Sequence, residues 1–235
     1  MATERRKKTQ KGQEIIEFAL MAFIFVPLFM GSFIVGMNLI RSIQCNQVTR
    51  DLVDMYIHGG DFSTYPIQQE AARLAQGLNL QVGSSFTGNQ QTNTGNAGNG
   101  LITVTQIMWI GSTASASCIA VGAGNCTNHD SFVYTQQIQF GNGNLSSSST
   151  VTLGTPSGAT MNSAGIVQNY ITDSHAKLPN AAQTAMQSLW GANVNTGQTA
   201  LTDGQVVYIV EGYFQSPDLS VGALAGNGVY ARYFM

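Results

Sequence analysis

The sequence predicts an α+β fold in which a long N-terminal helix, half of it transmembrane, packs on a small antiparallel β-sheet. The run from Phe18 to Met37 contains no charged side chain, and apolar residues continue after it at helical spacing. Later segments are rich in β-branched and aromatic residues, and one of them alternates apolar and polar positions. Such alternation is typical of half-buried strands.

The charge-free run is long enough to cross a membrane. Its twenty residues form a helix about 30 Å long, which is the thickness of a bilayer core. Half of the ten Lys and Arg residues lie in the first eleven positions. Because a basic flank stays in the cytoplasm, we expect one span over about residues 18–40 with the C-terminal domain outside. A secretory signal would have a shorter apolar core, so this segment is interpreted as a retained anchor.

A glycine and a glutamate stand in a distinctive order where the basic leader meets the apolar run. Gly12 is followed directly by Gln13, and Glu17 comes five residues after the glycine. A carboxylate beside the bilayer core costs at least a few kcal/mol without a partner. Cleavage between Gly12 and Gln13 would supply a cation, the new α-amino group, in the same or a neighbouring subunit. In the alternative interpretation, Glu17 lies among the lipid headgroups and favours the positive end of the helix dipole.

This segment resembles the class III signal peptide of type IV pilins and pseudopilins, which prepilin peptidase cuts after the glycine. The sequence Glu17-Phe18-Ala19-Leu20 is similar to the anchor start of TadE-like minor pilins, which assist assembly of Flp-type pili in tight-adherence secretion systems. Residues 206–211 and 230–232 resemble the closing strands of that family, whereas the middle of this chain is longer and richer in Asn and Gly.

The resemblance implies a pilin-like fold and a structural role in the bacterial inner membrane, with a periplasmic or extracellular domain that can enter a pilus. It implies Gly12 and Gln13 as the processing site and Glu17 and Phe18 as recognition and assembly residues. The implied partners are prepilin peptidase, other pilin or pseudopilin subunits, inner-membrane assembly proteins and lipid. Two alternatives remain open: an uncleaved, single-pass anchored binding or adhesion domain, and a major pilin, for which the outer domain is bulky.

The chain is expected to consist of a leader over residues 1–12, a long helix over 13–60 and an outer α+β domain over 61–235. Apolar residues from Leu39 to Met55 continue the helix beyond the membrane, and Arg50 and Asp54 can pair across one turn. Gly59 and Gly60 end it.

The outer domain is expected to contain a meander-like sheet of four or five strands. We expect strands over 101–110, 132–140, 205–215 and 229–234, helices over 66–80, 166–171 and 182–190, and a Gly/Asn-rich surface loop over 83–100. In the second strand the alternation places Phe132, Tyr134, Ile138 and Phe140 toward one core and Thr135, Gln137 and Gln139 toward water.

Two of the three cysteines are close in sequence and lie in the outer domain. Cys118 and Cys126 are therefore predicted to form a disulfide, which would stabilise the fold by about 2–3 kcal/mol. A metal site that adds His129 is the alternative, although it lacks a fourth ligand. Cys45 on the long helix is interpreted as a buried thiol, with an intersubunit disulfide as the alternative.

Charge and motif content argue against other function classes. Without residues 1–12 the chain keeps five basic and eleven acidic side chains, so it has no electrostatic basis for nucleic-acid binding. The histidines at positions 58, 129 and 175 lie in no nucleophile or metal motif, and the glycine clusters lack the residues of a phosphate-binding loop. We therefore expect neither catalysis nor a metal or cofactor.

Overall fold

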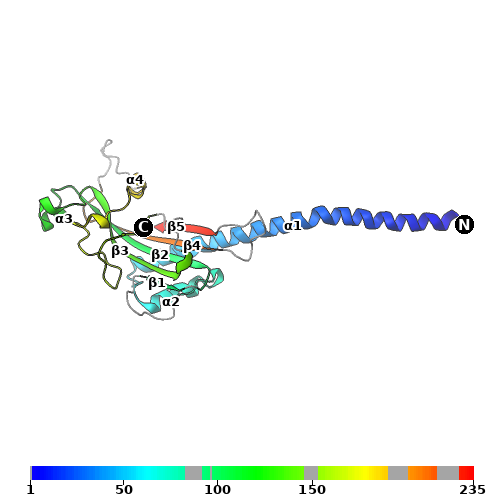
Figure 1. Ribbon diagram of the computed structural model, residues 1–235, viewed down its shortest axis with the longest axis horizontal. Coiled ribbons are helices and arrows are strands. Elements are labelled where there is room, and N and C mark those ends of the chain that lie inside the picture. Colours follow the sequence, from blue (N-terminus) through cyan, green and yellow to red (C-terminus); the bar gives the residue numbers. More distant parts are fainter. Residues whose placement is uncertain (1, 83–91, 96, 146–152, 190–200, 216–227) are drawn as a thin grey trace. The chain divides into compact units, whose positions relative to one another are not determined.

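The fold is that of a computed structural model, which describes residues 2–82, 92–95, 97–145, 153–189, 201–215 and 228–235 (Figure 1). The chain divides into two compact units, Met1–Arg41 and Ser42–Met235. Helix α1 (Ala2–Ile57) runs through the boundary between them, and Pro27 does not interrupt it. The helix begins earlier than the predicted start at Gln13, because the basic leader contains no Gly or Pro before Gly12.

The end of α1 agrees with the sequence prediction. Gly59 adopts a positive φ of 88°, and the Gly60 N–H donates to the Met55 carbonyl at 2.8 Å. A Cβ atom at Gly60 would lie 2.7 Å from that carbonyl oxygen, so glycine is required there. The expected pair of Arg50 with Asp54 is not formed; the Asp54 carboxylate lies 3.5 Å from His58 Nδ1.

Five strands form one sheet, which together with α1 confirms the α+β class. The strands are β1 (Thr92–Gly95), β2 (Gly100–Ile110), β3 (Ser131–Asn142), β4 (Val206–Phe214) and β5 (Val229–Phe234), in the spatial order β1-β3-β2-β4-β5 (Figure 1). All neighbours are antiparallel except β1, which pairs in parallel with β3.

Two details of the predicted sheet are wrong. The sheet is not a simple meander, because β4 pairs with β2 rather than with the preceding strand β3. Residues 92–95, which the sequence places in a Gly/Asn-rich loop, form β1. Backbone pairing along a sheet edge does not require apolar side chains, so a polar segment can add a short strand there. Residues 83–91 and 96 of the predicted loop lie outside the described residues.

A β-bulge in β3 corrects the predicted alternation. The pairing of β2 with β3 shifts between Gln106, which opposes Gln136, and Ile107, which opposes Tyr134. One extra residue in a strand reverses which face the following side chains occupy. Phe132 and Tyr134 therefore lie in a different hydrophobic cluster from Ile138 and Phe140. Gln137, predicted to face water, is buried on the same face as Tyr134.

One face of the sheet is covered by the second half of α1 and by α2 (Tyr65–Leu74). Leu52 and Val53 of α1 are fully buried there, among side chains of β2, β3 and β4. The helix lies close to Gly212 of β4, where an added Cβ would lie 2.7 Å from Thr49 Cγ2. The predicted helix over 66–80 is thus confirmed in its first part, and it continues as a short 3-10 turn, η1 (Gln76–Leu78).

The opposite face is covered too, by residues 153–178 and by α4 (Asn180–Leu189), so the expectation of a sheet covered on one side is wrong. Helix α4 confirms the predicted helix near 182–190, and its Gln183 side chain both accepts from and donates to the Phe132 backbone, at 2.9 and 2.6 Å. No helix forms over 166–171. The Val167 N–H donates instead to the Thr135 carbonyl of β3 at 2.9 Å, so this segment follows the sheet edge.

The remaining elements are short. They are α3 (Ala116–Val121), η2 (Ala123–Asn125), η3 (Gly143–Leu145) and η4 (Ser174–Ala176).

Candidate functional site

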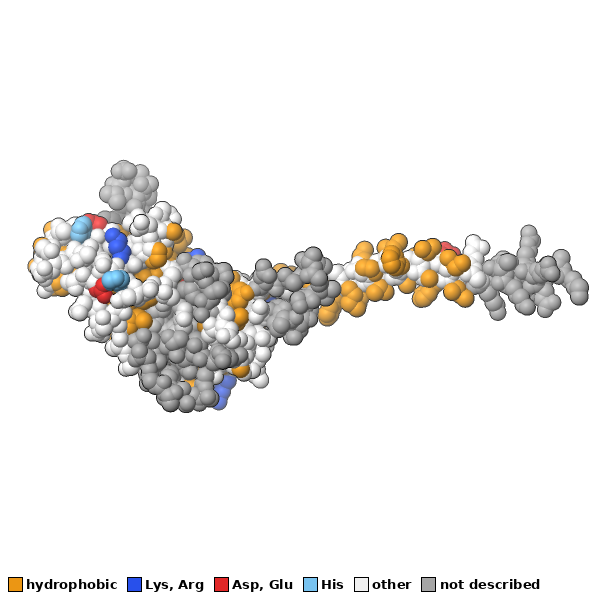
Figure 2. Space-filling model, in the orientation of Figure 1, with side chains coloured by type: hydrophobic (Ala, Val, Ile, Leu, Met, Phe, Trp, Pro, Cys, Tyr) orange, Lys and Arg blue, Asp and Glu red, His pale blue; other side chains and the backbone are white. Residues whose placement is uncertain are grey.

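The apolar first part of α1 is the candidate functional surface. Its large apolar side chains from Ile15 to Val35 are more than half exposed, with Ile34 as the exception. In Figure 2 hydrophobic side chains are spread along the visible side of this helix. Contiguous apolar surface of this extent marks a contact with membrane or protein. The surface is therefore the candidate for a contact outside the described protein.

The length and composition of this helix meet the requirements of a membrane span. Within the described residues, one stretch, Gly12–Ile57, is long and apolar enough to cross a bilayer. Very little of its most apolar part is buried in the protein, unlike the core helix of a soluble domain. The helix is therefore compatible with a single membrane span or a signal anchor.

The predicted processing and recognition residues all lie on the exposed N-terminal part of α1. Gly12, Gln13 and Glu17 are helical and exposed, and a Cβ atom added at Gly12 would touch nothing within 4 Å. Phe18 is 76% exposed. Gln13 and Glu17 are four residues apart, so they occupy the same side of the helix one turn from each other.

The second part of α1, residues 42–57, provides no comparable surface. Cys45 is fully buried, and its thiol faces the carbonyl oxygens of Gly212 and Val229 at 3.8 and 4.0 Å. Burial raises the pKa of the Cys45 thiol to about 12. A buried, protonated thiol does not reach a neighbouring subunit, so the geometry favours the interpretation of Cys45 as a packing residue over an intersubunit disulfide.

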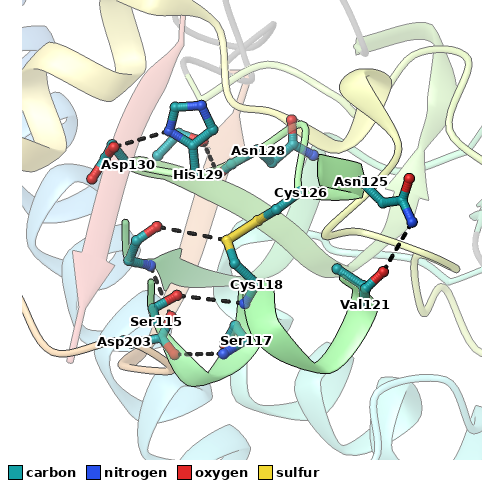
Figure 3. Close-up of a disulfide and its surroundings, with 12 residues drawn as sticks. Ser115, Ser117, Cys118, Val121, Asn125, Cys126, Asn128, His129, Asp130 and Asp203 are labelled. Atoms are coloured by element: carbon teal, nitrogen blue, oxygen red, sulfur yellow. Dashed lines mark hydrogen bonds and ion pairs between the residues drawn. A yellow bond between two sulfur atoms is a disulfide. The ribbon is translucent and has the colours of Figure 1, made fainter. Parts of the chain in front are cut away.

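Cys118 and Cys126 are joined by a disulfide at the end of β2 (Figure 3). Both residues are buried in a small apolar cluster with Ile110 and Val133. The disulfide uses both thiols, so the alternative Cys-Cys-His metal site does not form. The part of the chain that the structure describes contains no group of three His, Cys, Asp or Glu side chains able to hold a metal.

Asp203 fixes the disulfide segment to the sheet, a role that the sequence analysis missed. Its carboxylate accepts the backbone N–H groups of Gly111, at the end of β2, and of Ser117, in the first turn of α3, at 2.8 and 2.9 Å (Figure 3). Burial alone would raise the pKa of Asp203, but these hydrogen bonds outweigh it and lower the pKa below its ordinary value. Asp203 stands alone in a polar segment, so no sequence pattern indicates this contact.

The three histidines each lie beside one aspartate, at separate places on the surface. His129 Nδ1 lies 2.9 Å from Asp130, and His175 Nδ1 lies 2.9 Å from Asp173. His58 lies near Asp54. The backbone N–H of His175 donates to Asp173 and, with the ring, lowers the pKa of that carboxyl group. These are local surface pairs that bring no third functional group with them.

Glu211 is the second important residue that the sequence analysis did not single out. It lies in β4 with a side chain that is fully buried on the face opposite α1. The alternation in Val207, Ile209 and Glu211 was visible in the sequence and places all three on one face. It could have identified Glu211 as a buried carboxylate.

Comparison with known proteins identifies no relative: no protein-family model, no curated protein and no solved structure matches the chain.

Proposed function

We propose that the chain is a pilin-type structural subunit, a TadE-like minor pilin or pseudopilin that is anchored in the bacterial inner membrane and assists assembly of a tight-adherence pilus or secretion apparatus. The observation that carries the proposal is the contrast within α1. An exposed apolar helix follows a basic leader, and the same helix continues without a break into the core of the C-terminal unit.

Each unit of the chain contains one part of α1, and the two parts suit different roles. Here Leu52 and Val53 hold the second part of α1 in the core, while the first part keeps its apolar side chains available for lipid or for neighbouring helices. Lateral packing of such helices is the proposed assembly mechanism.

The exposed position of Gly12 supports the proposed cleavage between Gly12 and Gln13 by prepilin peptidase. Cleavage removes the basic leader and creates an α-amino group on Gln13, one helical turn from Glu17. That amino group, or the equivalent group of a neighbouring subunit, compensates the Glu17 carboxylate at the edge of the apolar region. The proposed N-terminus is cytoplasmic before cleavage, because of the basic leader.

The intact mass and N-terminal sequence of the protein from its native membranes test this proposal, with a Gly12→Leu variant as the comparison. We expect a native start at Gln13 that the substitution abolishes. Gln10→Leu is the matched control, since it changes the leader without touching the cleaved bond and should leave the start at Gln13. A native start at Met1 or Ala2 would contradict the proposal and favour an uncleaved, anchored binding or adhesion domain.

A further inference from the structure

A row of four polar side chains crosses the sheet on the face opposite α1. In the strand register, Thr103 of β2 stands between Gln139 of β3 and Glu211 of β4, and Glu211 is followed by Arg232 of β5. Register partners of antiparallel strands point to the same face, with Cβ atoms about 4.5–5.5 Å apart. The Thr103 hydroxyl therefore has a carboxamide on one side and a carboxylate on the other.

The two central members of this row are shielded from water, and the contacts of the row hold its groups in place. Thr103 and Glu211 are each 1% exposed. Gln139 Nε2 donates to Thr103 Oγ1 at 3.3 Å. On the other side, the Tyr230 hydroxyl donates to Glu211 Oε1 at 2.5 Å, and Arg232 Nε lies 4.0 Å from the same oxygen. The register thus makes an alcohol, an acyl group and a carboxylate neighbours in one row, and acyl transfer requires these three kinds of group.

We propose that Thr103 and Gln139 become joined by an intramolecular ester bond in the folded protein. Thr103 Oγ1 attacks the Gln139 side-chain carbonyl carbon, and Glu211 accepts the hydroxyl proton. The bond from Oγ1 to Cδ forms, the bond from Cδ to Nε2 breaks, and the proton held by Glu211 leaves with the nitrogen as ammonia. No oxidant, reductant or second substrate is required.

The distances permit this reaction with a small movement. The Gln139 carbonyl carbon is one bond, about 1.33 Å, from the nitrogen that contacts Thr103. Rotation about the terminal torsion of Gln139 exchanges only the nitrogen and the carbonyl oxygen, so the carbon must approach the hydroxyl through small changes in χ1 and χ2. A reacting distance of about 3–3.5 Å is then within reach.

The neighbouring row of the same sheet provides an internal control. Gln137 Nε2 donates to Thr105 Oγ1 at 3.2 Å, and Thr105 is fully buried. However, the β4 residue opposite Thr105 is Ile209, so this pair has no carboxylate beside it. Chemistry that depends on Glu211 should therefore occur at Thr103 and not at Thr105.

Mass spectrometry of the full-length protein tests the proposal. We expect the wild type to be lighter than its sequence by about 17 Da, the mass of one ammonia expelled by the hydroxyl nucleophile. Chymotrypsin cuts at aromatic residues, including Trp109 and Tyr134 between the two sites, and we expect it to release linked peptides that contain Thr103 and Gln139. This peptide measurement needs no variant and therefore does not depend on how a substitution folds.

Three variants separate the ester from other losses of ammonia. Cyclisation of an N-terminal glutamine and succinimide formation at Asn142-Gly143 have the same mass effect, but both survive in Thr103→Val. We expect the linked peptides to disappear in Thr103→Val and Glu211→Gln and to persist in Thr105→Val. A wild type with unlinked peptides overturns the proposal, and persistence of the link in Glu211→Gln overturns the role of Glu211. None of these results depends on the proposed assembly function.

Discussion

The two parts of α1 share one helix but occupy opposite environments. Leu28, in the first part, is 66% exposed, whereas Leu52, in the second part, is fully buried. The first part has apolar side chains on all sides, while the second part presents Asn46, Arg50 and Asp54 outward and buries its other face. The all-round apolar pattern is typical of a membrane span, and the one-sided pattern is typical of a helix packed on a soluble domain.

This comparison shows that the distribution of polar residues, rather than helix formation, distinguishes the two parts of α1. The polar stripe begins after Arg41, which is also where the chain divides into two compact units. The first part is therefore expected to contribute to anchoring and assembly, and the second part to the stability of the outer domain.

The largest expected effect comes from shortening one leucine in each part. We expect Leu52→Ala to lower the free energy of unfolding of the outer domain by about 2–5 kcal/mol, because it leaves a cavity in the core. Leu28→Ala is the matched control and should change it by less than about 0.5 kcal/mol. Urea unfolding of the detergent-solubilised protein, followed by tryptophan fluorescence, measures both. Equal effects of the two substitutions on the free energy of unfolding would contradict the claim that the two parts of α1 occupy different environments.

A smaller effect is expected where the second part of α1 contacts Gly212 of β4. Gly212→Ala places a methyl group 2.7 Å from Thr49 Cγ2, and such overpacking costs about 1–3 kcal/mol. Thr49→Ser removes Cγ2 and keeps the hydroxyl that donates to the Cys45 carbonyl at 3.0 Å. We expect the serine to recover part of the loss in the double variant, because Ile102 and Phe214 also approach the site at 3.3 Å. Additive effects in a double-mutant cycle would contradict this contact.

A substitution near the disulfide tests how much stability comes from a contact that does not involve α1. Asp203→Asn weakens two hydrogen bonds to backbone N–H groups, so we expect a loss of about 1–2 kcal/mol. The folded pKa of Asp203 is lowered below its ordinary value of 3.8. Its contribution is therefore complete above about pH 3.8 and declines as the pH falls through the folded pKa.

Urea unfolding between pH 3 and pH 7 measures this difference. We expect the gap between wild type and Asp203→Asn to narrow at the acidic end, and a gap that stays constant would refute the assigned role. The losses from Asp203→Asn and Leu52→Ala should add, because Leu52 packs in the cluster between α1 and the sheet, whereas Asp203 contacts Gly111 and Ser117, which are not part of that cluster.

The α+β class, the long helix and four of the five strands could be predicted because their signals are local. Periodicity identified α1 and β2 to β5, and the glycine pair identified the end of α1. The bulge in β3 could not be predicted, because the alternation of apolar and polar residues in the sequence runs through Thr135 as it would in a regular strand. Residues 166–171 have helical spacing, but backbone bonds to the edge of β3 replace the helix, and such bonds depend on tertiary structure.

The candidate surface was visible in the sequence because a charge-free run is a property of consecutive residues. The contacts of Asp203 and Glu211 were not, since each depends on strands or loops that are distant in the chain. Asp203 contacts Gly111 and Ser117, which precede it in the chain by 92 and 86 positions. The row that includes Thr103 and Glu211 exists only after β2, β3 and β4 have paired in one register.

The division of α1 is tested most directly by producing residues 42–235 without the first unit and measuring where the protein fractionates and whether it unfolds cooperatively. We predict a water-soluble, folded domain that retains the disulfide between Cys118 and Cys126, while the full-length chain remains in the membrane fraction. A shortened protein that stays with membranes, or that is unfolded in solution, would contradict the assignment of anchoring to the first part of α1 and of core packing to the second.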